Sequence, residues 1–294
     1  MSVSTLEQAP APATAGKSPG RRAWIRFRSN RIAMLALVLL GAINIAAVFA
    51  PVLAPYPPNA MSIRERLQPP SIKHPLGTDE NGRDMLSRLL YGARISLSVG
   101  LAAVVFAVFL GAIVGGAAGF AGGITDSVLM RVTDGMLSVP IFFFMITTLA
   151  LFGATLGNII LVIGATSWMS VARIVRGEVL RNREMPYVEA ARSLGAGPLY
   201  ILFRHVLPQS WPAIIVSATL GIGWAILMES SLSFLGLGVQ PPDSSWGNML
   251  AKARGYMWNA PLLAFIPGFA IFLTVLLYNW LGDGLRDALD PTST

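Results

Sequence analysis

One carboxylate, Glu229, interrupts an otherwise uncharged run of the sequence from Val206 to Leu237. A charge inside a membrane helix is costly, so it usually faces a water-filled path or a protein partner. Three hydroxyl residues share its stretch: Ser230, Ser231 and Ser233. Two hypotheses stay open. Either this group lines a solute path, with the carboxylate meeting an ammonium group, or Glu229 makes a structural contact.

Asp134 is the second candidate for a path, because it lies near the start of another apolar run. Arg131 precedes it by three residues, and side chains three apart on a helix can form an ion pair. We therefore expect Arg131 and Asp134 to pair with each other and to have a structural role.

Metal chemistry finds little support. The sequence has no cysteine and only two histidines, His74 and His205. The spans described below put them on opposite sides of a membrane, where they cannot bind one ion. We expect His74 in a loop and His205 at a helix end, and we predict no metal site.

A polar, basic loop from Arg173 to Arg204 carries a pattern of its own. A helix-forming run through Glu189 and Ala190 breaks between Gly195 and Pro198, and a second helical run follows. This pattern predicts a helix-turn-helix outside the membrane. A long loop with structure of its own is a natural docking element.

The composition of the chain indicates that membrane-spanning helices position these residues. Of 294 residues, 54% are hydrophobic and 13% charged, with a mean hydropathy of +0.61. A soluble domain carries about 25% charged residues. A helix needs about 20 apolar residues to cross a bilayer. The net charge of +7 comes largely from arginines that flank apolar blocks, so we assign it to a membrane surface and predict no nucleic-acid partner.

The apolar blocks predict an all-α membrane protein with about six transmembrane helices. A proline- and alanine-rich tail, residues 1–20, is predicted to be disordered. Gly153 and Gly157 are predicted to separate the third and fourth helices. Gly111, Gly115 and Gly119 lie on one face of the second and allow close packing there, or they reflect the general abundance of glycine in membrane helices. The predicted spans are Ile32–Ala54, Ile95–Thr125, two within Gly135–Ala172, Val206–Leu237 and Gly255–Gly282, with Tyr56–Arg94 and Gly238–Arg254 outside and a short inner turn at Asp126–Arg131.

Six spans place both termini on one side of the membrane. Arginines cluster before the first span and in the 173–204 loop, and the positive-inside rule assigns both to the cytoplasm. The first external segment also holds arginines, so the orientation depends on the flank of the first helix. We expect the N- and C-termini in the cytoplasm.

The loop also resembles a known family. The string Glu189-Ala190-Ala191, then Gly195, then Leu207-Pro208 about a dozen residues on, is similar to the signature loop of binding-protein-dependent ABC importer permeases. The resemblance implies a type I importer fold in which this loop forms a coupling helix seated on an ATPase subunit. The residues that it assigns to this contact are Glu189, Ala190, Ala191, Arg192, Gly195, His205, Leu207 and Pro208. The short Glu-Ala-Ala string also occurs in ordinary loop helices, and the full spacing favours the family.

Further stretches resemble the C-type permease of the dipeptide, oligopeptide and nickel branch. They are His74–Asp79 with Gly82–Arg94, Asp134–Pro140, the signature loop, and Glu229–Gly238 followed by Pro241-Pro242. This resemblance spans residues 20 to 290. It implies domains at 1–20 (tail), 21–94 (first helix and external segment) and 95–290 (permease core, with the coupling loop at 173–210).

The family implies a multi-pass protein of the bacterial inner membrane that imports di- or oligopeptides. Its expected partners are a second permease, two ATP-binding subunits and a periplasmic or lipid-anchored solute-binding protein. The sequence has no G-x-x-x-x-G-K-[ST] motif, so ATP and magnesium are expected on the partners and this chain is not expected to be an enzyme. Nickel or glutathione as the solute, another solute such as a sugar, a proton-coupled secondary transporter and a structural membrane scaffold are the alternatives.

Overall fold

The structure is a computed structural model that describes residues 19–290. The predicted disordered tail, residues 1–20, lies outside the described residues except for its last two, which begin α1. Within the described part of the chain the only β pairing is an isolated bridge between Thr78 and Asp84. The α-helices are α1 Pro19–Ser29, α2 Arg31–Val48, α3 Ala50–Leu53, α4 Met85–Ala121, α5 Gly123–Leu137, α6 Ile141–Phe152, α7 Leu156–Arg183, α8 Pro186–Ser193, α9 Pro198–Ile201, α10 Leu207–Phe234, α11 Trp246–Ala253 and α12 Leu262–Leu289.

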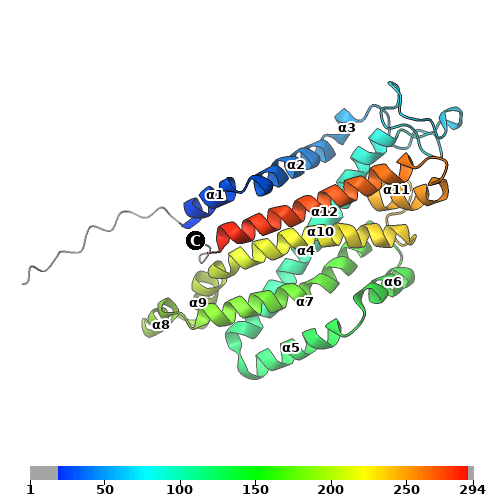
Figure 1. Cartoon of the computed structure of the whole chain (residues 1–294). Helices are drawn as coiled ribbons and strands as arrows, with labels where there is room; N and C mark the ends of the chain where they lie inside the picture. Colours follow the sequence, from blue (N-terminus) through cyan, green and yellow to red (C-terminus); the bar gives the residue numbers. More distant parts are fainter. Residues whose placement is uncertain (1–18, 291–294) are drawn as a thin grey trace, which may run out of the picture.

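Five helical segments in residues 19–290 are long and apolar enough to cross a membrane: α2, α4, α7, α9 continued into α10, and α12. The pair α5 and α6 passes the same test together but is bent by 78°. The long helices lie side by side, with α1, α8, α9 and the last turns of α12 at one end and α3 and α11 at the other (Figure 1). The prediction of an all-α membrane protein with about six spans is confirmed.

Glycines bring α4 and α7 into close contact, as the four-residue spacing predicts. A Cβ added to Gly115 would lie 2.3 Å from the Ala172 carbonyl oxygen, and one added to Gly111 would lie 2.6 Å from Val171 Cβ. Backbones can approach this closely only where side chains are absent. Around this pair, Val99, Ala103, Ile159 and other buried residues form an apolar core, which α10 completes.

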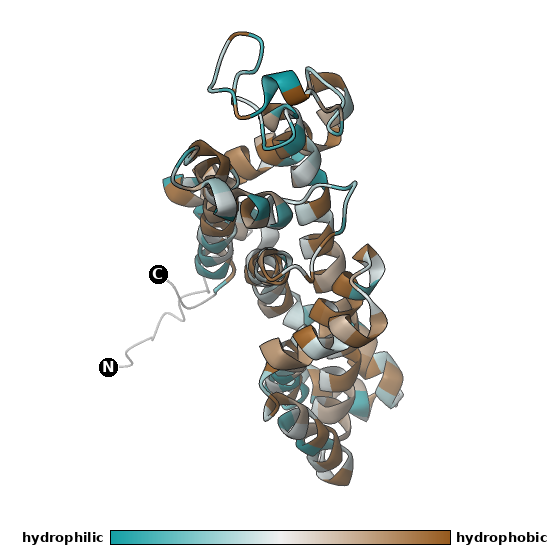
Figure 2. Cartoon of the chain, turned by 90° about the vertical axis from the view of Figure 1, so that its right-hand side faces the viewer, coloured by the Kyte–Doolittle hydropathy of each residue, from teal (hydrophilic) through white to brown (hydrophobic). Residues whose placement is uncertain are grey.

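The outer surfaces of the long helices remain apolar. Most of the helical ribbon consists of hydrophobic residues, and the loop between α3 and α4 carries many hydrophilic residues (Figure 2). On α4, Val105 is 60% and Phe109 66% exposed, and on α12, Phe265 is 63% exposed. Exposed apolar surface on this scale requires lipid or a protein partner.

The second span begins ten residues earlier than predicted. Met85–Arg94, assigned from its polarity to the external segment, is the start of α4. Asp84 ends the loop and caps the helix: its carboxylate accepts a hydrogen bond from the Ser87 backbone N–H at 2.8 Å. A side chain that satisfies a free N–H in the first turn stabilises the helix there, whatever the polarity of the next turns.

The third span also differs from its prediction. Asp126–Arg131 is helical within α5 and is not a turn, and the bend lies at Ser138–Pro140. Pro140 has no N–H to donate, which favours a helix end before it. Gly153 separates α6 from α7 as predicted, with a φ of 86°, whereas Gly157 lies inside α7.

Three further regions differ from their predicted boundaries. The α7 helix extends through Arg183, so the first third of the predicted coupling loop is helical. The α9 helix runs through a short π-helical turn into α10. In the predicted external loop, α11 forms a short helix, and the last span begins at Leu262 and not at Gly255.

Candidate functional site

The α8 helix stands at the end of the molecule beyond α7 and is fastened to it from one side (Figure 1). Pro186 begins the helix, where a missing N–H costs nothing. Val188 is fully buried in a cluster with Val175 and Val179 of α7 and Ile201 of α9. The short helix therefore has a defined position relative to the membrane helices.

Gly195 follows the end of α8 and adopts the left-handed backbone conformation of a tight turn. Its φ is 84°, in the left-handed region, and its N–H bonds the Arg192 carbonyl at 3.0 Å. The Ala196 N–H bonds the Ala191 carbonyl at 3.1 Å. These two bonds form a Schellman motif, in which glycine is strongly favoured because it lacks a Cβ.

The signature residues divide between two faces. Glu189, Ala190 and Arg192 are exposed, and neither charged group has an ion pair within residues 19–290. Ala191 is half-buried and packs on the apolar cluster below. The two alanines therefore do different things: Ala190 leaves the outer surface open, and Ala191 lets α8 lie close to its own chain. Burial also raises the pKa of the Tyr187 hydroxyl.

The second part of the motif lies nearby. His205 is half-buried and packs edge-on against the Tyr200 ring, with 5.6 Å between ring centroids. Leu207 packs on the same apolar cluster as Val188, and Pro208 is exposed in the first turn of α10. The structure thus brings the two halves of the signature loop onto one anchored unit.

Large apolar side chains on this unit are exposed, and sequence reasoning did not single them out. Leu194 is 89%, Leu199 69%, Tyr200 57% and Phe203 66% exposed. The sequence signal for them was the presence of large apolar residues within an otherwise polar, basic loop. Together with the free Glu189 carboxylate they form a surface, here named the α8–α9 surface, that suits a protein partner.

Ion pairs fix α5 against α7 near this surface, and one of them corrects a prediction. Asp134 pairs with Arg173 of α7, so the predicted pair between Arg131 and Asp134 is wrong. The bend before α6 and the packing of α5 beside α7 bring Arg173 within reach. Arg176 donates from Nε and Nη2 to the two carboxylate oxygens of Asp126, with 2.6 Å between Nη2 and Oδ2.

Glu229 lies in a different place, fully buried where α10 meets α4 and α11. Its Oε1 accepts from Ser233 Oγ at 2.7 Å, and its Oε2 accepts from Ser96 Oγ at 3.3 Å and Ser230 Oγ at 3.4 Å. Ser96 Oγ in turn accepts the Trp246 backbone N–H at 3.2 Å. Hydroxyl donors therefore satisfy the carboxylate without a cation.

The five residues predicted for a path are not all together. Ser230 and Ser233 join Glu229, but Ser231 is exposed and donates to the Leu227 carbonyl at 2.8 Å. Asp134 is half-exposed on α5 and engaged with Arg173. The contacts of Glu229 fit the structural hypothesis, and a role in a path stays a prediction. Ser96 was not singled out from the sequence, because its partner is 133 residues away.

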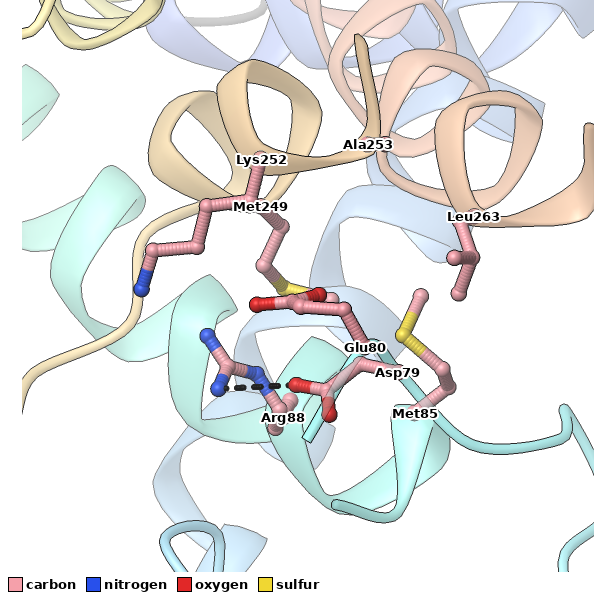
Figure 3. Close-up of a pocket in the computed structure, with 8 residues that line it drawn as sticks. All are labelled: Asp79, Glu80, Met85, Arg88, Met249, Lys252, Ala253 and Leu263. Atoms are coloured by element: carbon pink, nitrogen blue, oxygen red, sulfur yellow. Dashed lines mark ion pairs between the residues drawn. The ribbon is translucent and has the colours of Figure 1, made fainter. Parts of the chain in front are cut away.

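At the end opposite α8, the external motif from His74 to Arg88 forms a buried charge network. His74 Nδ1 lies 2.9 Å from Asp84 Oδ1, and Asp79 Oδ2 accepts from Arg83 Nε at 2.7 Å. Arg88 Nη1 lies 3.1 Å from the same Asp79 oxygen (Figure 3). The motif therefore builds the fold of the external loop and ties it to α4. His74 and His205 lie at opposite ends of the molecule, as expected.

Lys252 of α11 and Met249 close this network from above (Figure 3). Burial lowers the pKa of the Lys252 ammonium, and the nearby Arg88 and Arg83 charges lower it further. No group of three or more His, Cys, Asp or Glu residues suited to a metal ion occurs in the part of the chain that the structure describes.

A cavity of about 480 Å³ opens at the same end, between the loop after α3, the first turns of α4 and the loop before α11. Arg94 and Asp243 line it and do not pair with each other or with another charge in residues 19–290. Ser244 also lines it, with a buried hydroxyl that has no hydrogen-bond partner there. A cation and a carboxylate on one cavity can receive a zwitterion.

Two family models match the chain. The model described as "binding-protein-dependent transport system inner membrane component" matches residues 86–293, and that of the "N-terminal TM domain of oligopeptide transport permease C" matches residues 18–70. Together they cover most of the sequence, from α1 onward.

Similar proteins include the dipeptide transport system permease protein DppC of Bacillus subtilis, which is 43% identical over 274 residues (92% of this chain and 84% of that protein). The glutathione transport system permease protein GsiD of Pectobacterium atrosepticum is 42% identical over 276 residues (94% and 92%). Among solved structures, the MetNI methionine ABC transporter in an inward-facing conformation matches with a TM-score of 0.56 and 20% identity, over 70% of this chain and 98% of that one.

The solved structure shows that the helices have the fold of an ABC importer membrane subunit. The family match sets aside the secondary-transporter alternative, and also the scaffold. The chain therefore belongs to the inner membrane components of binding-protein-dependent transport systems, and it is a multi-pass permease subunit of an ABC importer.

Proposed function

We propose that this permease imports di- or oligopeptides across the bacterial inner membrane, with both termini in the cytoplasm. A second permease completes the path, and a periplasmic or lipid-anchored solute-binding protein delivers the peptide. Two ATP-binding subunits bind on the cytoplasmic side. ATP and magnesium belong to those subunits, and the chain itself catalyses no reaction.

The α8–α9 surface is the observation that carries the proposal. It combines exposed apolar side chains, of which Leu194 is 89% exposed, with the unpaired carboxylate of Glu189. Exposed apolar groups beside a charge are typical of a protein interface. Because Val188 anchors α8 to α7 and α9 continues into α10, movement of a partner on this surface would be transmitted to two membrane helices.

The peptide assignment is supported by relatives whose names specify dipeptide transport and by the family of the N-terminal helix. The outer cavity suits this solute class, since Arg94 can bind a peptide carboxylate and Asp243 its ammonium. Glutathione is the second candidate, favoured by the 42% identity to GsiD. It is also a zwitterionic peptide derivative, so the same cavity chemistry suits both.

The experiment is purification of the tagged chain from its native membrane with whatever subunits accompany it. We expect a second permease and an ATP-binding subunit, and uptake of labelled peptides into proteoliposomes only with ATP and the binding protein. Glutathione and nickel are tested in the same vesicles. Uptake of one of these without peptide uptake would overturn the peptide assignment and keep the permease role.

A variant of the surface makes the assay specific to coupling. Leu194→Asp places a charge at an exposed site and leaves the buried anchor Val188 intact. We expect loss of association with the ATP-binding subunit while the permease pair still assembles. The control is Ile63→Asp, which is 86% exposed at the other end of the molecule. Normal association of the Leu194 variant would contradict the role of the α8–α9 surface.

A further inference from the structure

The α1 helix, which precedes the first span, has one face in the protein and one face outside it. Phe27 is 4% exposed and packs with Ala33 and Ala288, and Arg26 Nη1 donates to the Asp290 carbonyl at 2.9 Å. These contacts hold α1 against the end of α12. The helix is therefore a fixed part of the fold and presents its other face in a constant direction.

The outer face combines arginines with large apolar side chains. Arg21, Trp24, Ile25 and Arg28 follow each other at spacings of three, one and three residues, which places them on one side of a helix. Trp24 is 53% and Ile25 45% exposed, and both arginines are exposed. No acidic residue occurs in α1.

Three arginines of this region have no partner. Arg21, Arg28 and Arg31, at the first position of α2, form no ion pair or side-chain hydrogen bond with any described residue. Like charges repel one another, and a nearby anion offsets that repulsion. Arg26, on the inner face, is satisfied within the protein. Arg21 and Arg28 thus place unpaired positive charge on the outer face, and Arg31 adds another at the start of α2.

The place of α1 determines what can meet this face. The apolar span of α2 begins at Ile32, one residue after Arg31, and Asn30 caps it by accepting from the backbone N–H groups of Ile32 and Ala33 at 3.1 Å. The boundary between hydrocarbon and headgroups therefore lies next to α1. Tryptophan favours this boundary, and arginine binds phosphate there.

We propose that the outer face of α1 is a binding surface for anionic phospholipid headgroups, with Trp24 and Ile25 inserted among the upper acyl chains and Arg21, Arg28 and Arg31 bound to phosphate. Anionic lipid would then hold α1, and with it the adjoining ends of α2 and α12, in place. The proposal does not depend on which solute is transported.

A single labelled residue tests this in the full chain. The sequence has no cysteine, so Ile25→Cys gives a unique attachment point for an environment-sensitive fluorophore. The labelled chain is placed in phosphatidylcholine nanodiscs that contain equal small fractions of doxyl-labelled phosphatidylglycerol or doxyl-labelled phosphatidylcholine. We expect the anionic lipid to quench with about fivefold or greater preference, since each arginine at a membrane surface favours anionic lipid by roughly that factor.

Two further experiments test whether the arginines cause the preference for anionic lipid. In the same labelled chain, replacing Arg21, Arg28 and Arg31 by Gln should remove the preference, whereas Arg64→Gln in the external loop should keep it. Without any further variant, 1 M salt should also remove it, because the Debye length falls to about 3 Å. Equal quenching by both lipids in the labelled chain, or a preference that survives both the substitutions and salt, would overturn the proposal.

Discussion

Gly195 and Gly197 lie two residues apart at the end of α8, and they differ in one physical property. Neither has a heavy atom within 4 Å of an added Cβ, so alanine fits the space at both positions. The φ of Gly195 is 84°, whereas that of Gly197 is −69°. A left-handed residue with a Cβ costs roughly 1–2 kcal/mol, and an extended one costs nothing. Gly195→Ala should therefore disturb the turn, and Gly197→Ala should not.

The cost converts directly into a weaker partner. If α8 must end in its Schellman turn to present the α8–α9 surface, then 1–2 kcal/mol lowers the equilibrium constant for that conformation by roughly 5- to 30-fold. We expect the dissociation constant for the ATP-binding subunit to rise in Gly195→Ala, by up to about the same factor. Gly197→Ala should change it less than twofold, because a φ of −69° accepts a Cβ without strain and no atom lies in its way.

The assay is titration of the purified ATP-binding subunit onto nanodisc-embedded permease, followed by peptide-stimulated ATPase activity. Because neither substitution adds a clash, a difference between them isolates the backbone conformation at Gly195. Wild-type affinity in both variants would refute the reasoning, since the left-handed turn would then have no bearing on the contact. Equal losses would refute it too, by pointing to bulk in place of conformation.

Two other predictions concern the end of the molecule opposite α8. Ser96→Ala should lower the free energy of unfolding by about 1–3 kcal/mol, because the buried Trp246 N–H loses its acceptor. Thermal unfolding measures this loss, and the exposed control Ser98→Ala should stay within about 0.5 kcal/mol of wild type. Lys252→Gln should stabilise the chain at pH 7, because burial and Arg88 lower the Lys252 pKa and the unfolded state binds the proton more tightly. The free energy of unfolding of the wild type should rise with pH between the lowered Lys252 pKa and the ordinary value of about 10.4. The stability difference between Lys252→Gln and wild type should therefore shrink from about pH 7 to about pH 10.5. A constant difference would contradict the lowered Lys252 pKa.

Much of the membrane architecture follows from the sequence by itself. Bilayer thickness requires long apolar runs, and the runs are in the sequence, so the number of spans and the all-α class are predictable. Close packing on one face of α4 was predicted from Gly111, Gly115 and Gly119, because small residues at helical spacing permit it, and the structure identifies α7 as the partner. The turn at Gly195 was predictable for a similar reason, since glycine ends helices in the left-handed conformation.

Helix ends and polar partners were decided by tertiary structure. Hydropathy cannot place the start of α4, because the Asp84 cap stabilises a polar first turn that belongs to a charge network. The partner of Asp134 is Arg173, 39 residues away, and no local rule selects it over Arg131 at helical spacing. Local spacing describes one helix, and these contacts join two.

Glu229 shows the same division most clearly. The sequence determines that a carboxylate sits in an apolar helix, which restricts it to a few roles because burying an unpaired charge is costly. Only the packing of α4 and α11 against α10 supplies Ser96 and places the Trp246 N–H beside it. A long-range hydrogen bond depends on how helices are arranged in space, and that arrangement is a property of the whole chain.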